Sequence, residues 1–438
     1  MTRTLIRNLA SKANQTVTVR GWLHKKRLLG GLNFITLRDR SGLAQSLIED
    51  KNELEKLRGL QIGSVVALTG VVSADDRAPG GIELHNVAVE VEVPVTDEPP
   101  IEIDKSISHK SENLDTLFDN RVIGLRNSQE QNVFKIQAGL TKALREYFYR
   151  HDFVEIHTPK LLAEATEGGA EVFRLEYFDK TATLAQSPQF YKQIMVGAYE
   201  RVFEIAPVYR AEPSATTRHM TEYTSVDGEL GFIDLDDLKS FLSGLLHYVT
   251  KSIWSDCETE LKSWNATKPL LPKEIPTVAM SEIHTKYSQA TGENTVGEKD
   301  LRPDEERWVC EYAKKNLASE SVFVSEWPAS EMKFYHQANE ADPTKADRVD
   351  LLFRGVEIAT VSMREYRYNM VLKQLKKFVG SDSKDHPGFK PLLTSMKYGM
   401  PPHGGFGLGL ERLTQKLIGL ANVKEATLFP RDINRLTP

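Results

Sequence analysis

The sequence is poor in cysteine and has no long apolar run. Only Cys257 and Cys310 occur among its 438 residues, which excludes a disulfide framework, and they are not spaced like paired zinc ligands. No run of about 20 apolar residues is present, which excludes a membrane-spanning helix. The first residues also lack the apolar segment of a secretory signal. We therefore expect a cytoplasmic protein, because the cytosol keeps thiols reduced.

The sequence also lacks a strong excess of charge of one sign. It has 56 Lys and Arg against 61 Asp and Glu, a formal net charge of −5. This mild acidity argues against a protein that coats nucleic acid unspecifically, although a local basic patch remains compatible with it. The 40% of hydrophobic and 27% of charged residues are ordinary for a globular protein and exclude a disordered or fibrous chain. The length predicts two or three domains.

Residues 1–103 have the pattern of short strands. Valines at every second position from Val87 to Val93 indicate a half-buried strand, and Ser64–Val72 is a mostly apolar strand candidate. Turn-forming residues lie between such runs, at Asp39–Gly42 and Ala78–Gly81. Four or five strands within this length predict a small barrel or sandwich. Residues 104–130 follow a polar, proline-led stretch and are interpreted as a linker.

Residues 131–438 combine helical and strand patterns. Apolar residues at helical spacing predict a helix over 133–148, and Phe153–Ile156 and Phe203–Tyr209 are predicted to be buried strands. Asp236 is a candidate N-cap for a further amphipathic helix. Residues 255–330 are polar and weakly patterned, and we interpret them as an insertion or lobe of the same domain.

Three segments carry groups suited to chemistry on phosphates. In the first, an apolar strand ends at Arg210, and a second strand carries Asp227 and Glu229 at alternate positions. Such a hairpin can direct Arg210 toward a phosphate and place the two acids on one face. Taken alone, the segment is better explained as a surface hairpin that carries scattered charges.

The second and third segments lie further along the chain. Gly404–Leu413 is rich in glycine but matches neither the P-loop nor the dinucleotide-binding pattern. Its glycines allow close approach of backbone and ligand, or simply form a turn that packs a helix. In the third segment, a turn at Arg354–Gly355 separates Asp350 from Glu357. These carboxylates can converge on Mg²⁺, or form a hairpin salt bridge.

Together, the three segments resemble motifs 2 and 3 of the class II aminoacyl-tRNA synthetases, in the same order and at similar separation. Further resemblances narrow the family to its aspartyl and asparaginyl members. They are Phe153–Pro159 (motif 1), Thr166–Glu171 (the flipping loop), Gln186–Lys192 (the aspartyl substrate motif), Gly21–Arg40 (the anticodon-reading domain) and Leu428–Asp432 (the archaeal-type ending).

The resemblance implies an α+β protein with an N-terminal OB-fold β-barrel at 1–103. A class II catalytic domain, with an antiparallel sheet flanked by helices, would occupy 131–438. It also implies a homodimer that uses ATP and Mg²⁺. In this family aspartate attacks the α-phosphate of ATP, and the aspartyl group then passes to the 3′-terminal adenosine of tRNA. Such a reaction needs positioning and charge stabilisation rather than a protein nucleophile.

The resemblance also implies a role for individual residues around the nucleotide. Arg210 would hold the α-phosphate and act with Arg412 as a catalytic residue. The implied ATP ligands are Arg210, Glu212 (adenine amino group), Arg218 and His219 (outer phosphates), Tyr223 (adenine ring), Glu357 and Arg412 (γ-phosphate side). The implied magnesium ligands are Asp350, Glu357 and Thr360.

For the amino acid, the resemblance implies that Lys192 and Arg364 hold the β-carboxylate of aspartate. The α-ammonium group would be bound by Glu167, Gln189 and Asp227. Asparaginyl enzymes usually lack the lysine, so Lys192 favours aspartate. In contrast, Val361-Ser362-Met363 replaces the usual Gly-Gly-Gln of aspartyl enzymes, and Ser362-Met363-Arg364-Glu365 is closer to the asparaginyl version. Because a β-branched residue does not replace a positive-φ glycine cheaply, we expect a regular strand and a reshaped pocket there.

In the N-terminal domain, Arg27, Phe34 and Gln45 match the anticodon readers of the family. Phe34 can stack on a base, and Gln45 can hydrogen-bond a base edge. His24 and Pro79 stand where enzymes strict for tRNA-Asp carry tryptophan and lysine. The pair resembles the relaxed form, which implies that tRNA-Asn is charged with aspartate as well. An amidotransferase would then have to convert the product.

Other functions remain open from the sequence. A strict aspartyl enzyme and an asparaginyl enzyme are the nearest alternatives. A binding protein without acylation activity is disfavoured because Arg210, Glu212, Asp350, Glu357 and Arg412 are all present. An amide-forming ligase that does not use tRNA would have no need of an anticodon-like domain.

Overall fold

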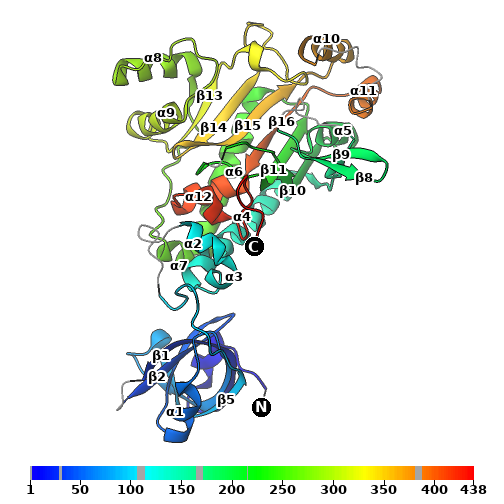
Figure 1. Cartoon of the computed structure of the whole chain (residues 1–438). Coiled ribbons are helices and arrows are strands. Elements are labelled where there is room, and N and C mark those ends of the chain that lie inside the picture. Colours follow the sequence, from blue (N-terminus) through cyan, green and yellow to red (C-terminus); the bar gives the residue numbers. More distant parts are fainter. Residues whose placement is uncertain (1, 29–31, 106–113, 164–170, 215, 380–386) are drawn as a thin grey trace. The chain divides into compact units, whose positions relative to one another are not determined.

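The computed structural model describes the chain except for residues 1, 29–31, 106–113, 164–170, 215 and 380–386 (Figure 1). The chain divides into two compact units, residues 1–131 (together with 438) and residues 132–437. None of the described helices is both long and apolar enough to cross a membrane.

The first unit is built on a closed five-stranded barrel with the strand order β1-β2-β3-β5-β4. Its strands are β1 (Thr16–Leu28), β2 (Asn33–Asp39), β3 (Gly42–Leu47), β4 (Val65–Ala74) and β5 (Ile82–Val93), and its helices are η1 (Ile6–Lys12), α1 (Lys51–Arg58) and η2 (Pro79–Gly81). Alternate residues of the strands point inward to an aliphatic core that includes Val19, Leu37 and Leu68. The predicted barrel is confirmed.

The stretch interpreted as a linker contains two short helices. These are α2 (Leu114–Asp119) and α3 (Arg121–Gly124). Leu117 packs with Ile101 and Ile103 in a small apolar cluster. Arg121 forms a buried ion pair with Glu130, with 2.6 Å between Nη1 and Oε2. A few apolar side chains and one buried ion pair thus order part of a mostly polar segment.

The second unit is organised around an eight-stranded sheet with the order β12-β13-β14-β15-β16-β11-β10-β6. Its strands are β6 (Val154–Glu155), β10 (Arg201–Tyr209), β11 (Glu222–Gly231), β12 (Thr277–Ala279), β13 (Ser321–Ser325), β14 (Arg348–Phe353), β15 (Val356–Arg364) and β16 (His403–Gly409). All neighbouring strands are antiparallel except the β10–β6 and β12–β13 pairs. The predicted α+β class is therefore confirmed.

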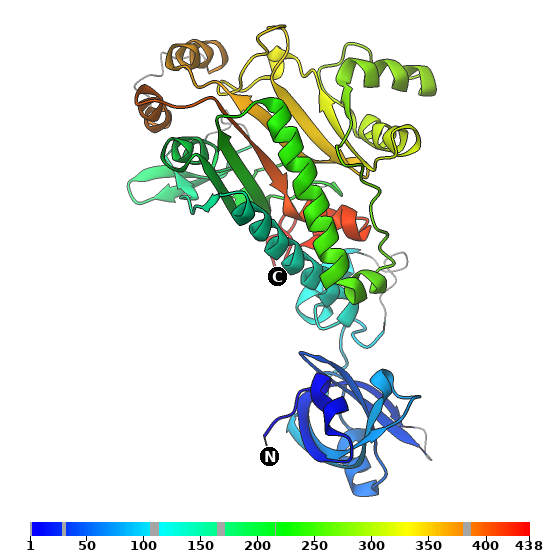
Figure 2. The same ribbon diagram turned by 180° about the vertical axis from the view of Figure 1, so that it is seen from behind.

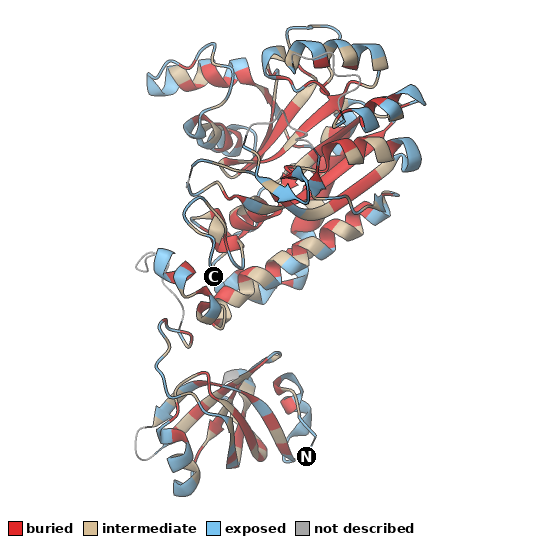
Figure 3. Ribbon diagram, turned by 45° about the vertical axis from the view of Figure 1, so that its right-hand side comes forward, coloured by how far each residue is buried: buried red, intermediate tan, exposed pale blue. Residues whose placement is uncertain are grey.

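Two long helices, α4 (Ser128–Arg150) and α6 (Leu235–Asp256), lie across one face of this sheet (Figure 2). Their apolar residues form the main core with β10, β11, β14, β15 and β16. Figure 3 distinguishes the buried residues of these elements from the exposed ones by colour. The N-cap of α6 is Asp234 and not Asp236, because Asp234 accepts a hydrogen bond from the Asp237 backbone N–H and completes a capping box.

Residues 255–330 belong to the second unit and extend its sheet at one edge. They contribute strands β12 and β13 at one edge, with α8 (Met280–Thr291) and α9 (Pro303–Asn316) packed beside them. The remaining elements of the unit are β7 (Leu161–Leu162), β8 (Arg174–Tyr177), β9 (Lys180–Leu184), α5 (Gln189–Tyr199), α7 (Glu258–Ser263), η3 (Ala329–Glu331), α10 (Tyr368–Phe378), α11 (Lys390–Lys397), α12 (Leu410–Ile418) and η5 (Val423–Ala426).

Candidate active site

The central strands have one apolar and one polar face. On β11, Val226 and Leu230 face the core under α4 and α6, whereas Ser225 and Asp227, on either side of Val226, line a cavity. On β16, Phe406 lies in the core and Gly407 lines the cavity. Because strand side chains alternate, this pattern places the polar groups together on the face opposite the two long helices.

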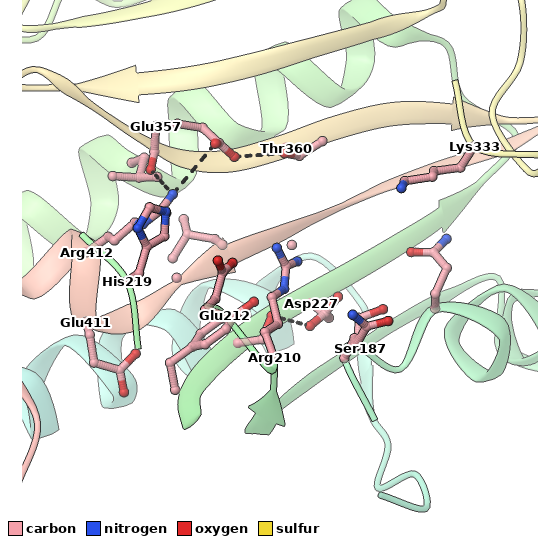
Figure 4. A pocket seen from close by; sticks show the side chains of 18 of the residues that line it. Ser187, Arg210, Glu212, His219, Asp227, Lys333, Glu357, Thr360, Glu411 and Arg412 are labelled. Atoms are coloured by element: carbon pink, nitrogen blue, oxygen red, sulfur yellow. Dashed lines mark hydrogen bonds and ion pairs between the residues drawn. The ribbon is translucent and has the colours of Figure 1, made fainter. Parts of the chain in front are cut away.

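The cavity has a volume of about 360 Å³, within the range of small-molecule sites. It receives side chains from α5, β11, β15, β16 and α12, and from the segments that follow β10 and η3 (Figure 4). In Figure 4, Glu357, Thr360 and Arg412 lie toward one end of the site, and Asp227 and Ser187 lie toward the other.

The second of these ends contains a buried cluster of four charged side chains. The Lys192 ammonium is 2.9 Å from Asp227 Oδ1 and 3.5 Å from Glu229 Oε2, and it also donates to the Phe406 carbonyl at 2.9 Å. Arg364 donates to Glu229 through Nε (2.8 Å) and Nη2 (3.2 Å). All four residues are less than 5% exposed. The prediction that Asp227 and Glu229 share a face is confirmed.

The two cations favour the ionised form of Glu229. Burial alone would raise the pKa of Glu229, but the charges of Arg364 and Lys192 outweigh it and lower that pKa below its ordinary value. Two cations thus balance two carboxylates in a water-poor environment. Gly405 is required beside them, because a Cβ there would overlap the Glu229 carboxylate and the Gly228 carbonyl oxygen.

At the opposite end, Glu357 is held from two sides. Thr360 Oγ1 donates to Glu357 Oε1 at 2.8 Å. Arg412 Nη1 donates to the Glu357 carbonyl at 2.8 Å and lies 3.6 Å from Oε2. Asp350 lies behind them and pairs with Arg348 at 2.8 Å. Burial raises the pKa of Asp350 to about 7, and although Arg348 opposes this shift, the Glu357 charge adds to it.

The middle of the cavity carries the residues that follow β10. The Arg210 guanidinium lies 5.8 Å from the centre of the Tyr223 ring. His219 Nδ1 is 2.7 Å from Thr216 Oγ1. Burial lowers the pKa of His219. The Glu212 charge opposes this shift, and the Arg412 and Arg218 charges add to it. Arg218 forms an ion pair with Glu306 of α9.

Most of the predicted site residues line this one cavity. They are Gln189, Lys192, Arg210, Glu212, Arg218, His219, Tyr223, Asp227, Glu357, Thr360, Arg364 and Arg412. Asp350 does not line it but lies directly behind, on β14. Glu167 and most of the predicted flipping loop lie outside the described residues.

The sequence reasoning missed several residues that line the same cavity. They are Ser187, Lys333, Tyr335, His336, Arg348 and Glu411. Glu411 accepts hydrogen bonds from the Thr224 backbone N–H at 3.0 Å through both oxygens, and burial raises its pKa to about 7. Its position in the sequence, directly before the predicted site residue Arg412, could have identified it as a candidate. Lys333 and His336 come from an irregular segment, where the sequence has no periodicity to interpret.

Val361 lies in a regular part of β15. It pairs with Val349 of β14 on one side and with Phe406 of β16 on the other. This confirms the expectation that the backbone is a regular strand at Val361, where aspartyl enzymes usually have a glycine.

The barrel positions its candidate anticodon readers on neighbouring strands. Arg27 lies directly opposite Phe34, and Gln45 lies opposite Thr36. Gln45 Nε2 donates to Glu83 Oε1 at 2.7 Å. Phe34 and Gln45 alternate with core-facing Ile35 and Ala44 and therefore face outward.

The two residues that imply relaxed tRNA choice lie elsewhere on the barrel. His24 sits at an irregularity of β1, between Leu23 and Lys25, and is only 8% exposed. Burial and the Arg38 charge lower its pKa. Pro79 begins η2.

Comparison with known proteins agrees with both units. Residues 113–433 match the family described as tRNA synthetases class II (D, K and N), and residues 17–93 match the OB-fold nucleic acid binding domain. These matches define an aminoacyl-tRNA ligase with a nucleic-acid-binding module. The chain belongs to the class II tRNA synthetases of the D, K and N group.

Individual relatives match over all or nearly all of their length. The chain is 41% identical to the aspartate–tRNA(Asp/Asn) ligase of Thermus thermophilus, with 100% of both chains covered. It is 37% identical to the aspartate–tRNA(Asp) ligase of Pyrococcus abyssi, with 96% of both covered. Its structure is similar to that of an asparaginyl-tRNA synthetase from Pyrococcus horikoshii complexed with asparaginyl-adenylate, with a TM-score of 0.92, 30% identity and 100% of both chains covered.

Proposed function

We propose that this chain activates L-aspartate with ATP and transfers it to both tRNA-Asp and tRNA-Asn. One observation carries the choice of amino acid: two buried cations, Lys192 and Arg364, stand in the same cavity as the predicted nucleotide residues. A fixed pair of cations suits a substrate whose side chain is a carboxylate.

The same cluster supports discrimination against asparagine. Glu229 holds the guanidinium plane of Arg364 through two donors, and Asp227 holds the Lys192 ammonium at 2.9 Å. Cations held this firmly interact well with the β-carboxylate. A neutral amide in its place would lose those charge-assisted contacts and leave the donors poorly matched.

The nucleotide end supports attack of the aspartate α-carboxylate on the α-phosphate of ATP. In this proposal Arg210 stabilises the negative charge that grows on the α-phosphate, and Arg218, His219 and Arg412 bind the outer phosphates. Tyr223 offers its ring to the adenine, and Glu212 accepts from its amino group. The residues position charge and move no proton, which fits a reaction in which the substrate carboxylate is itself the nucleophile.

The carboxylates on β14 and β15 fit Mg²⁺. Within the described residues, no group of three or more His, Cys, Asp or Glu side chains could enclose a metal ion. Mg²⁺ commonly takes only one or two carboxylates and completes its shell with waters and phosphate oxygens. Glu357, Thr360 and Asp350 supply oxygens of this type. When bound, the ion would neutralise phosphate charge.

The barrel supports the proposed tRNA choice. Phe34 presents a ring for stacking beside Arg27, a combination typical of single-stranded RNA binding. His24 occupies the position at which we infer that relaxed enzymes differ from strict ones. Relaxed charging would require an amidotransferase to convert aspartyl-tRNA-Asn.

We further propose that the chain acts as a cytoplasmic homodimer, with Pro159 at the interface.

Aminoacylation in a two-by-two design tests this function. Aspartate or asparagine is supplied with tRNA-Asp or tRNA-Asn transcripts, and charged tRNA is measured. We expect aspartate to be attached to both tRNAs. Aspartate on tRNA-Asp alone would contradict the relaxed choice inferred from His24 and Pro79. Asparagine on tRNA-Asn would show that the Val361–Glu365 stretch, and not Lys192, determines the amino acid.

A further inference from the structure

Glu306 of α9 contacts both Arg218 and Glu357 of the nucleotide site. Glu306 itself does not line the cavity. Its Oε2 accepts from the Arg218 guanidinium and, at 3.1 Å, from the backbone N–H of Glu357. Glu306 comes from the 255–330 region, which the sequence left without a role. The contacts join residues 88 and 51 positions apart in the chain.

We propose that Glu306 is a positioning residue for ATP, which sets Arg218 and Glu357 before the nucleotide binds. The inference rests on the proposed function, because it takes Arg218 as a ligand of the outer phosphates and Glu357 as a ligand of the metal.

The Arg218 loop has few other anchors. Its described hydrogen bonds include Arg218 N–H to Thr216 Oγ1 at 3.2 Å, within the loop, and Val423 N–H to the Thr217 carbonyl at 3.0 Å. The ion pair with Glu306 is therefore the side-chain contact that directs the guanidinium. Glu306 engages Arg218 through Nη2, and a guanidinium has five N–H donors. One group can thus bridge the carboxylate and a phosphate.

The second contact acts on the strand that carries the metal ligands. The β14–β15 ladder is irregular between Leu351 and Leu352, opposite Glu357. An irregularity of this kind redirects side chains. By accepting from the Glu357 N–H, Glu306 fixes the backbone at the point from which the Glu357 carboxylate reaches Thr360 and Arg412.

The ion pair between Glu306 and Arg218 lies in a mostly buried setting. The Glu306 side chain is only 13% exposed. Burial raises its pKa, Arg218 lowers it, and the neighbouring Glu357 raises it again. If Arg218 left, a buried carboxylate would remain beside a second one, which is costly. Glu306 therefore retains Arg218 rather than releasing it to the nucleotide.

The test is aspartate-dependent ATP–pyrophosphate exchange with Glu306→Gln, which removes the charge but keeps an acceptor for the Glu357 N–H. We expect the KM for ATP to rise about tenfold, the effect of losing one charged hydrogen bond. The kcat and the KM for aspartate should stay within about twofold, since Glu306 contacts neither reacting group. Glu311→Gln is the matched control, because Glu311 is an exposed residue of the same helix and should change nothing.

A double-mutant cycle with Arg218→Ala isolates the mechanism. In the Arg218→Ala background, Glu306→Gln should change the KM for ATP less than about threefold, because the guanidinium to be positioned is gone. An equal effect in both backgrounds, or an unchanged KM, would overturn the proposal. A lowered KM would also overturn it, since Glu306 would then compete with ATP for Arg218.

The proposed function and this inference fail in different ways. If the wild type shows no aspartate-dependent exchange, the function is wrong. Glu306 is then judged by direct calorimetric titration with ATP and Mg²⁺, which needs no amino acid. Weaker binding by Glu306→Gln, with an unchanged unfolding temperature, supports the positioning role, and equal binding overturns it.

Discussion

Replacement of Lys192 by methionine tests how the cavity selects its amino acid. Methionine keeps an unbranched side chain of similar length but removes the ammonium that lies 2.9 Å from Asp227 Oδ1. In the wild type two cations balance two carboxylates, whereas the variant leaves one carboxylate uncompensated. The β-carboxylate of aspartate would lose a charge-assisted contact and meet added negative charge. Each charged hydrogen bond contributes about 1.5–3 kcal/mol, so kcat/KM for aspartate should fall by roughly 100-fold.

Asparagine should respond differently, because its amide carries no charge. We expect its kcat/KM in pyrophosphate exchange to change by less than about threefold. Removing one partner of a buried ion pair also costs about 3–5 kcal/mol of stability, so thermal unfolding must be measured in parallel. Lys160→Met is the control: Lys160 pairs with buried Glu204 at 2.8 Å and does not line the cavity. The reasoning is refuted if aspartate activity survives within threefold, or if both amino acids lose activity equally.

Three further predictions concern other parts of the molecule. Arg210→Ala should abolish adenylate formation while leaving the circular dichroism spectrum unchanged, and normal pyrophosphate exchange would remove Arg210 from the site. His24→Trp should shift the ratio of kcat/KM values toward tRNA-Asp, and an unchanged ratio would eliminate His24 as a determinant. Because the folded-state pKa of Glu411 is raised from 4.5 to about 7, its contribution to stability is full below pH 4.5 and is lost as the pH rises through 7. In urea unfolding between pH 4.5 and 8, Glu411→Gln should therefore lose about 3 kcal/mol less than the wild type, and parallel pH profiles would contradict this.

The parts of the fold that periodicity dictates were predictable from the sequence. Alternating valines marked β5, and apolar residues at helical spacing marked α4. The exact start of α6 was not predictable, because Asp234, Asp236 and Asp237 lie close together in the sequence. Only the geometry shows which side chain reaches the first free N–H groups of the helix. The short helices at 114–124 were missed because their few apolar residues are informative only once they are seen to pack together.

The candidate site also contains residues that the sequence could predict and residues that it could not. Residues in recognisable motifs, such as Arg210 and Arg412, were assigned from the resemblance. Glu306 could not be assigned from the sequence, because its partners are 51 and 88 residues distant and no local pattern links them. The glycines of β16 suggested close approach by a ligand, yet Gly405 makes room for the Glu229 carboxylate of the neighbouring strand. Contacts of this kind depend on strand register, which the sequence of one strand does not encode.

The most direct test of the central claim is ATP–pyrophosphate exchange by the wild-type chain, with aspartate and asparagine supplied separately at equal concentration. The buried pair of cations, Lys192 and Arg364, predicts exchange that depends on aspartate and is at least about 100-fold weaker with asparagine. Exchange that depends on asparagine, or that is equal for both amino acids, would contradict the account.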